Sequence, residues 1–270
     1  MKITYLGTSA AEGFPAIFCN CKFCNEARAL GGKNIRTRSQ SLINDDMLID
    51  FPQDTYHHFL TGNIQGDKIK HLLITHAHSD HLYLEDLVLR YGAFAHNMRQ
   101  ERLNIVAGGN AYDMLSKTEQ HGITLLKISS YETIQLGDYR VTALPARHAI
   151  GTGALIYVIE GEKTILYAHD TGFLFDEVLE FIAEKRFSFD LVSLDCTNVD
   201  IPISDEGNHM GLPNIRRLVC RLNEIRAVSE LTRIVINHFS HNAAPFYDSL
   251  VEAVRSDGFI VSYDTMTLEV

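Results

Sequence analysis

The segment KHLLITHAHSDH, residues 70–81, constrains the fold more than any other part of the sequence. Residues 71–75 are typical of a buried strand, and four metal-ligand side chains follow within six positions. Side chains two positions apart in an extended loop lie on the same side, so His76 and His78 can reach one metal ion. Asp80 and His81 come where the chain turns toward a helix, so they point elsewhere and can serve a second ion. These ligand types suit Zn, Mn or Fe. A polar loop with chance histidines is the alternative.

Other strand ends supply the further ligands that two metal ions need. His148 follows a strand in LPARHAIGTG, Asp170 ends TILYAHDTG, and His238 ends RIVINHFSHN. Each of these side chains, taken alone, would more often cap a loop or bond a backbone group. Their shared position after strands, together with the cluster at 76–81, favours metal ligands.

The cysteines indicate a separate metal site. Three of the five lie together as C-x-C-x₂-C, at Cys19, Cys21 and Cys24. An odd count bunched in this way fits a disulfide framework poorly. Three thiolates can surround one tetrahedral zinc ion but leave a fourth position open, which His241 naturally completes. Three reduced cysteines without a metal are the alternative. We interpret the remaining two, Cys196 and Cys220, as buried thiols.

Strand and helix patterns alternate along the whole chain. Hairpins are expected at 41–51, 132–146 and 154–170, and single strands at 2–7, 71–75, 103–108, 189–195, 233–239 and 259–264. Helices are predicted at about 53–61, 83–95, 110–121, 174–185, 212–224 and 245–255. We expect one α/β domain over residues 1–270, in which two sheets pack face to face with helices outside, an αββα four-layer sandwich.

Charge and hydropathy narrow the range of partners. The chain has 24 Lys and Arg against 34 Asp and Glu, a formal net charge of −10, which argues against nucleic-acid binding. A small anionic substrate remains compatible, because bound metal ions reverse the local field. No apolar run approaches the roughly 18 residues of a membrane span, and the N-terminus lacks a secretory pattern. We therefore expect a cytoplasmic protein without a membrane partner, and the sequence leaves a homodimer open.

The order of these motifs resembles the metallo-β-lactamase superfamily over essentially the whole chain. HxHxDH is followed by a His, by an Asp before Thr-Gly, and by a late His. The resemblance implies seven ligands: His76, His78 and His148 for one metal, Asp80, His81 and His238 for the other, and Asp170 as the bridge. Asp50, in MLIDF, matches the early aspartate that supports the ligand loop from behind. An ordinary strand-end carboxylate is the alternative for Asp50.

The cysteine motif and the terminal HxxH narrow the resemblance further. Together they look like the phosphoribosyl cyclic phosphodiesterases of bacterial phosphonate breakdown, in which the cysteines and the last histidine bind a structural zinc. The stretch SAAEGFPAIFCNCKFCNEAR is also similar to the B factor of pyrroloquinoline quinone synthesis, a relative that lacks an intact HxHxDH. The intact motif favours the hydrolase. The alternatives are a ribonuclease Z-like enzyme, a thioesterase or lactonase, and a non-catalytic B-like protein.

The expected reaction is hydrolysis of a small phosphodiester, such as phosphoribosyl 1,2-cyclic phosphate, by a hydroxide bound between two Zn or Mn ions. A structural Zn is expected at the cysteines. His209, in SDEGNHMGL, resembles the late loop histidine that acts as general acid or phosphate ligand in phosphodiesterases of this superfamily, although it could simply cap the next helix. We assign Asp80 and His209 to catalysis. Asp195 and Thr197 in SLDCTN end a strand on the same edge as Asp170 and are expected to line the pocket.

Overall fold

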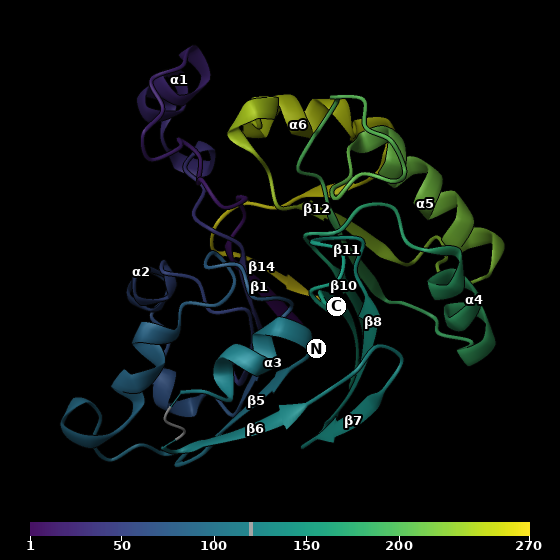
Figure 1. Ribbon diagram of the computed structural model, residues 1–270. Helices are drawn as coiled ribbons and strands as arrows, with labels where there is room; N and C mark the ends of the chain where they lie inside the picture. The colour runs from purple at the N-terminus through teal and green to yellow at the C-terminus, as the bar shows by residue number, and fades with distance from the viewer. Residues whose placement is uncertain (119–120) are drawn as a thin grey trace.

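Two seven-stranded sheets pack face to face, and helices cover their outer faces (Figure 1). The structure is a computed structural model that describes residues 1–118 and 121–270. This arrangement confirms the predicted αββα sandwich. Among the helices of the described residues, none combines the length and the apolar character that crossing a bilayer requires.

The first sheet brings the ends of two neighbouring strands to one edge. Its order is β14 (Met266–Glu269), β1 (Lys2–Gly7), β2 (Gln40–Ile43), β3 (Met47–Ile49), β4 (His71–Leu73), β5 (Leu103–Ala107) and β6 (Ile123–Lys127). Strands β3 to β6 run parallel, with Ile49 opposite Leu73. Asp50 and the segment 76–81 therefore leave the sheet side by side.

The second sheet brings the ends of three neighbouring strands to one edge. Its order is β13 (Ile260–Val261), β12 (Arg233–Asn237), β11 (Leu191–Asp195), β10 (Thr164–Ala168), β9 (Leu155–Glu160), β8 (Tyr139–Pro145) and β7 (Thr133–Leu136). Strands β10 to β13 run parallel. Asp170, Asp195 and His238 consequently lie at one edge of this sheet.

Alternating side chains divide the core into layers. In β9, Tyr157 belongs to the apolar cluster between the sheets, whereas Ile156 and Val158 belong to the cluster under the outer helices. The helices are α1 (Lys22–Leu30), α2 (Thr55–Thr61), α3 (Gly109–Leu115), α4 (Asp176–Lys185), α5 (Leu212–Glu224) and α6 (Tyr247–Ala253). Figure 1 shows α4, α5 and α6 over the second sheet and α2 and α3 over the first.

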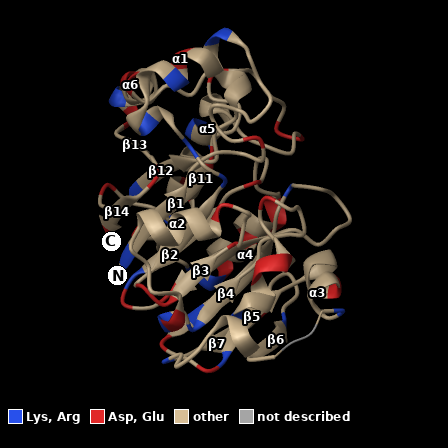
Figure 2. Ribbon diagram, turned by 90° about the vertical axis from the view of Figure 1, so that its left-hand side faces the viewer, with Lys and Arg blue, Asp and Glu red and all other residues tan. Residues whose placement is uncertain are grey.

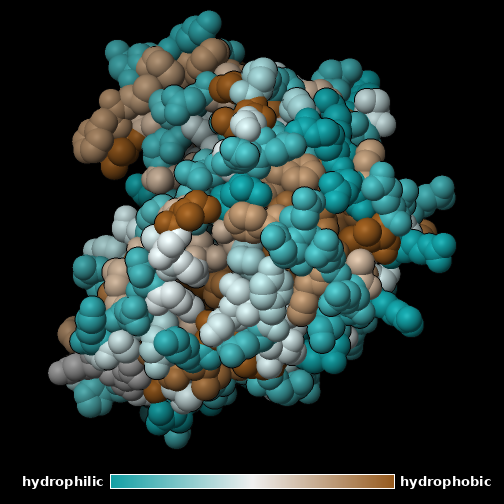
Figure 3. Space-filling view, turned by 45° about the vertical axis from the view of Figure 1, so that its right-hand side comes forward, coloured by the Kyte–Doolittle hydropathy of each residue, from teal (hydrophilic) through white to brown (hydrophobic). Residues whose placement is uncertain are grey.

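Helix α1 stands apart from the sheets, next to α6 (Figures 1 and 2). The ring of Phe246 joins the two parts, with its centroid 5.6 Å from that of Phe14 and 6.2 Å from that of Phe23. Apolar atoms appear on the surface of this projecting part in the space-filling view (Figure 3), and Phe18 is 96% exposed.

Several local predictions were wrong. The segment 83–95 forms the 3₁₀ turns Leu84–Arg90 and Gly92–Phe94 and no α-helix, and the extended backbone of Tyr91 (φ −141°, ψ 173°) separates the two turns. The helix expected at 110–121 ends at Leu115, and its residues 119–120 lie outside the described part. Helix α1 and strands β6 and β14 had not been predicted. Cys196 is buried as expected, but Cys220 is exposed.

Candidate metal centre

The Asp170 carboxylate lies at the centre of the strand-end residues. Its Oδ2 is 3.1 Å from His76 Nε2 and 3.0 Å from His81 Nε2, and its Oδ1 is 3.2 Å from His148 Nδ1. Asp170 is buried. Burial alone would raise the pKa of this carboxyl group, but the surrounding histidines hold it well below its ordinary range. The carboxylate is therefore ionised and available as a bridge.

Three histidines gather on one side of Asp170. The ligand atoms of His76, His78, His148 and Asp170 all lie within 4.8 Å of one another. His78 Nδ1 is 2.9 Å from His76 Nε2 and 3.2 Å from His148 Nε2. This is the group that the resemblance assigns to the first metal.

A second group shares Asp170 from the other side. The ligand atoms of Asp80, His81, Asp170 and His238 also lie within 4.8 Å of one another, and all four residues are buried. His81 Nε2 is 3.3 Å from Asp80 Oδ2, and His238 Nε2 is 3.8 Å from Asp170 Oδ2. The structure thus brings all seven predicted ligands together in two groups that meet at Asp170.

The unpaired atoms of the site test whether metal ions fit it. His81 Nε2, His238 Nε2 and Asp170 Oδ1 are buried. Ionisable neighbours lie 3.0–3.8 Å away, but none of the three atoms makes a hydrogen bond of acceptable geometry among the described residues. Buried polar atoms without partners are costly, and native structures rarely keep them. Two divalent cations would satisfy these atoms, and a set of imidazoles and carboxylates suits Zn or Mn.

Asp50 fixes the orientation of the His81 ring. Its buried carboxylate lies 2.7 Å from His81 Nδ1 and accepts from the backbone N–H of Thr75 at 2.8 Å. With Nδ1 occupied in this way, His81 presents Nε2 to Asp170 and Asp80. Asp50 is therefore placed behind the ligand loop, where the resemblance puts the early aspartate.

Asp195 orients two histidine rings, those of His209 and His238, a role that the sequence did not indicate. Its Oδ2 is 3.0 Å from His209 Nδ1 and 3.5 Å from His238 Nδ1, and Thr197 Oγ1 is 2.8 Å from His238 Nδ1. Burial alone would lower the pKa of His209, but Asp195 and then Asp170 raise it to about 9. The available sequence signal for this role was that Asp195 ends a strand on the same edge as Asp170.

The site lies at the base of a cavity of about 320 Å³. Ala10, Glu12 and Ser240 form part of its wall, and His78, His148 and His209 face it from other loops. The side chain of His209 is 28% exposed, so it is accessible from this cavity. The arrangement can bind a small molecule against two cations with a histidine alongside.

The cysteines form a separate group with His241. The ligand atoms of Cys19, Cys21, Cys24 and His241 lie within 4.8 Å of one another, and Cys24 Sγ is 3.5 Å from His241 Nδ1. Cys21 caps α1, where the backbone N–H of Cys24 donates to its sulfur and lowers the pKa of the Cys21 thiol to about 6. Three sulfurs and one nitrogen are a tetrahedral zinc set.

One loop connects this group with the central site. His238 and His241 lie three residues apart, and Glu12 holds the loop between them. The Glu12 carboxylate accepts from Ser240 Oγ at 2.6 Å and from the backbone N–H of His241 at 3.1 Å. The N-terminal segment also pairs with Phe239, since Ala10 N donates to Phe239 O at 2.9 Å.

Comparison with known proteins gives a consistent family and fold. The family model described as the β-lactamase superfamily domain matches residues 48–236. The zinc-bound PqqB from Methylobacterium extorquens has a TM-score of 0.75 at 17% identity, with 100% of both chains covered. A diphosphatase from the PhnP family has a TM-score of 0.75 at 21% identity, covering 100% of this chain and 97% of that one. The short form of human tRNase Z has a TM-score of 0.65 at 16% identity, covering 100% and 99%. No curated protein sequence matches significantly.

Proposed function

The chain belongs to the metallo-β-lactamase superfamily, and from this premise we propose that it is a metal-dependent phosphodiesterase of small cyclic phosphodiesters, such as phosphoribosyl 1,2-cyclic phosphate. The observation that carries the proposal is the meeting of two complete ligand groups at Asp170, with His209 facing the same cavity. A non-catalytic protein has no need for an open two-metal site with an acid beside it. The PhnP-family diphosphatase, similar over the whole chain, supports phosphate chemistry.

We assign one metal ion to each of the two ligand groups. His76, His78 and His148 would hold one ion, Asp80, His81 and His238 the other, and Asp170 would bridge them. When bound, the two cations would supply an activated water and neutralise charge on the phosphate oxygens. Zn or Mn would serve at this centre, and a structural Zn at the cysteines.

His209 is proposed as the general acid. Its Nδ1 is bound to the Asp195 carboxylate, which leaves Nε2 for the cavity. The neighbouring carboxylates raise the pKa of His209, and in its protonated form the ring can give a proton to the leaving alkoxide. Asp195 holds the ring and favours its charged form, and Asp80 completes the catalytic set as a ligand.

Size and charge favour a small substrate. A cavity of about 320 Å³ matches the lower end of small-molecule sites. The net charge of −10 disfavours the phosphate backbone of a long nucleic acid. On the side of the molecule shown in Figure 2, Lys and Arg residues are interspersed with Asp and Glu residues. A tRNA-processing role therefore receives less support than a small cyclic phosphate.

A substrate panel with defined metals tests this function. Protein loaded with Zn or Mn is assayed with an aryl phosphodiester, a ribose 1,2-cyclic phosphate, a 2′,3′-cyclic nucleotide, a thioester, a lactone and a pre-tRNA. We expect the ribose cyclic phosphate to give the highest kcat/KM. His209→Ala should lower kcat by about 10²–10⁴-fold with unchanged metal content, as loss of a general acid does. The exposed His57, changed to Ala, is the control and should keep full activity.

Two results would overturn the proposal. Turnover of pre-tRNA alone would indicate a ribonuclease Z-like enzyme. A fully metal-loaded protein that hydrolyses no phosphodiester would favour a thioesterase, a lactonase or a non-catalytic role.

A further inference from the structure

A second cavity, of about 350 Å³, lies on the outer face of the first sheet and shares no lining residue with the cavity at the metal centre. Its floor comes from three consecutive strands, through Leu48 of β3, Leu72 of β4 and Leu103 at the start of β5. Phe59 of α2 and Leu87 of the 3₁₀ turn Leu84–Arg90 contribute further apolar walls. Leu89 also lines the cavity and is 46% exposed, so the cavity opens to solvent there.

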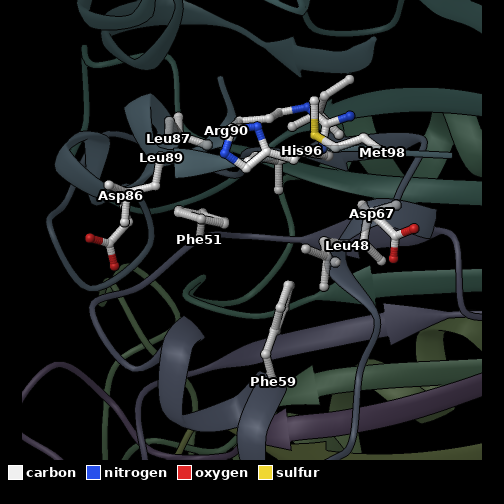
Figure 4. Close-up of a pocket in the computed structure, with 15 residues that line it drawn as sticks. Leu48, Phe51, Phe59, Asp67, Asp86, Leu87, Leu89, Arg90, His96 and Met98 are labelled. Atoms are coloured by element: carbon white, nitrogen blue, oxygen red, sulfur yellow. The ribbon is translucent and has the colours of Figure 1, made fainter. Parts of the chain in front are cut away.

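Three charged side chains interrupt this apolar lining, and Arg90 is the one cation among them, beside Asp67 and Asp86. Arg90, His96 and Met98 lie along one side of the cavity, across from Phe51 and Phe59 (Figure 4). Arg90 Nη2 donates to the backbone carbonyl of Gln100 at 2.6 Å. Its Nε is buried and has no hydrogen-bond partner in the part of the chain that the structure describes. A buried donor on a charged group is costly unless an acceptor meets it.

The nearby carboxylates do not neutralise Arg90. Asp67 and Asp86 lie at opposite ends of the cavity (Figure 4). The Asp67 carboxylate is engaged by Arg99, whose Nη2 donates to Asp67 Oδ1 at 2.8 Å. Burial lowers the pKa of Arg90, and the attraction of Asp67 only partly offsets this effect. The guanidinium is thus a half-buried cation in an apolar wall without a paired anion among the described residues.

From this geometry we propose that the cavity binds a small amphipathic monoanion, an apolar body carrying a single carboxylate that pairs with Arg90. The apolar walls would bury the body, and the carboxylate would pair with the charge of the Arg90 guanidinium, which lines the cavity. A medium-chain carboxylate is of suitable size, since cavities of this volume enclose small ligands. The site is independent of the metal centre and of the reaction proposed for it.

Decanoate is the probe, titrated by calorimetry into the metal-loaded protein. We expect saturable binding with a Kd on the order of 0.1 mM, a usual strength for a ligand of this size. Decan-1-ol and decylamine have the same apolar body without the anion, and both should bind at least about tenfold more weakly. Decylamine binding as tightly as decanoate would overturn the assignment of the charge.

A carboxylate can also approach the metal centre, so variants are needed to show that decanoate binds in the cavity at Arg90. Arg90→Gln should weaken decanoate binding by about tenfold to a hundredfold, the usual loss for a hydrogen bond to a charged group. Arg102→Gln is the matched control, since Arg102 is exposed and bonds Thr124 Oγ1 and the carbonyl of Ile123. Ala95→Phe should abolish binding by filling the cavity, which Ala95 lines, with the fold checked by circular dichroism.

Other outcomes refute the site. Equal affinity in Arg90→Gln and the wild type would place the ligand elsewhere, and absence of saturable binding at millimolar decanoate would exclude the ligand class. Sedimentation tests the competing occupant, a second copy of the chain. A dimer that Leu89→Asp converts to monomer, without decanoate binding in either state, would make this face an interface instead.

Discussion

Each ligand histidine must present one particular ring nitrogen to the metal, and a hydrogen bond at the other nitrogen decides which. Asp50 does this for His81, where its Oδ2 lies 2.7 Å from Nδ1. We expect Asp50→Asn to weaken binding of the second metal by about 10–100-fold, the usual effect of losing such a partner. Competition with a chelator measures this loss of metal affinity. Asp54→Asn is the control, because Asp54 pairs with Arg38 outside the site. Equal metal affinity in both variants would contradict the role of Asp50.

Asp195 acts on His209 in a way that a pH profile detects. The carboxylate raises the pKa of His209 to about 9, so the ring is protonated below that pH and loses its proton above it. A general acid is active while protonated, so kcat should fall as the pH rises through the pKa of His209. Asp195→Asn removes the stabilising charge, and this basic limb should move to lower pH. The exposed Asp200, changed to Asn, should leave the profile in place. A limb that stays put in Asp195→Asn would exclude His209 as the titrating acid.

The sequence identifies ligands better than it identifies the residues behind them. His76 to His81 stand out because their spacing matches the chemistry of a metal site. Asp195 does not, since its contact with His209 depends on a loop of 13 residues, 196–208, whose path no local pattern specifies. Asp50, Asp170 and His238 also adopt left-handed φ values of 65°, 53° and 64°. Such values are uncommon for non-glycine residues, so a sequence gives no sign of them.

At the scale of elements, parallel strands explain why the site could be anticipated. The ends of β3 and β4, and those of β10, β11 and β12, meet at common edges, so strand-end ligands converge once the strands are placed. Elements with weaker patterns were missed. Strand β14 is a short edge strand with two exposed polar residues, and α1 has its first turn occupied by the cysteine motif. Pairing with β1 stabilises strand β14, and the Cys–His group stabilises helix α1, so both segments depend on tertiary contacts.

The projecting cysteine element should affect the central site through one loop. Glu12 bonds Ser240 and His241, three residues or fewer from His238. We expect Cys21→Ala to lose one zinc per chain and to turn over substrate more slowly, because the loop carrying His238 loses its anchor. Elemental analysis and kinetics on the same preparation measure both effects. Cys220→Ala, a change at an exposed cysteine outside the group, should alter neither. Unchanged turnover in a Cys21→Ala protein shown to lack that zinc would disprove the coupling.

At the scale of the whole molecule, the metal centre joins the two sheets. The loop after β4 of the first sheet supplies His76 to His81, whereas Asp170 and His238 follow β10 and β12 of the second sheet. Metal ions at Asp170 would therefore hold the halves of the sandwich together. They would also remove the cost of the unpaired buried atoms on His81 and His238.

Metal binding should consequently raise the stability of the entire fold. A ligand that binds only the folded chain stabilises it by about 4 kcal/mol at a free concentration 1,000 times its Kd, which corresponds to a rise in Tm on the order of 10 °C for a chain of this size. Calorimetric scans at a series of free Mn²⁺ concentrations measure this rise. Mn²⁺ is the informative ion, because thiolate sites such as the cysteine group prefer softer metals. Asp170→Ala removes the shared ligand, so its Tm should no longer depend on Mn²⁺. A wild-type Tm that is constant across the series would contradict a metal-held junction between the sheets.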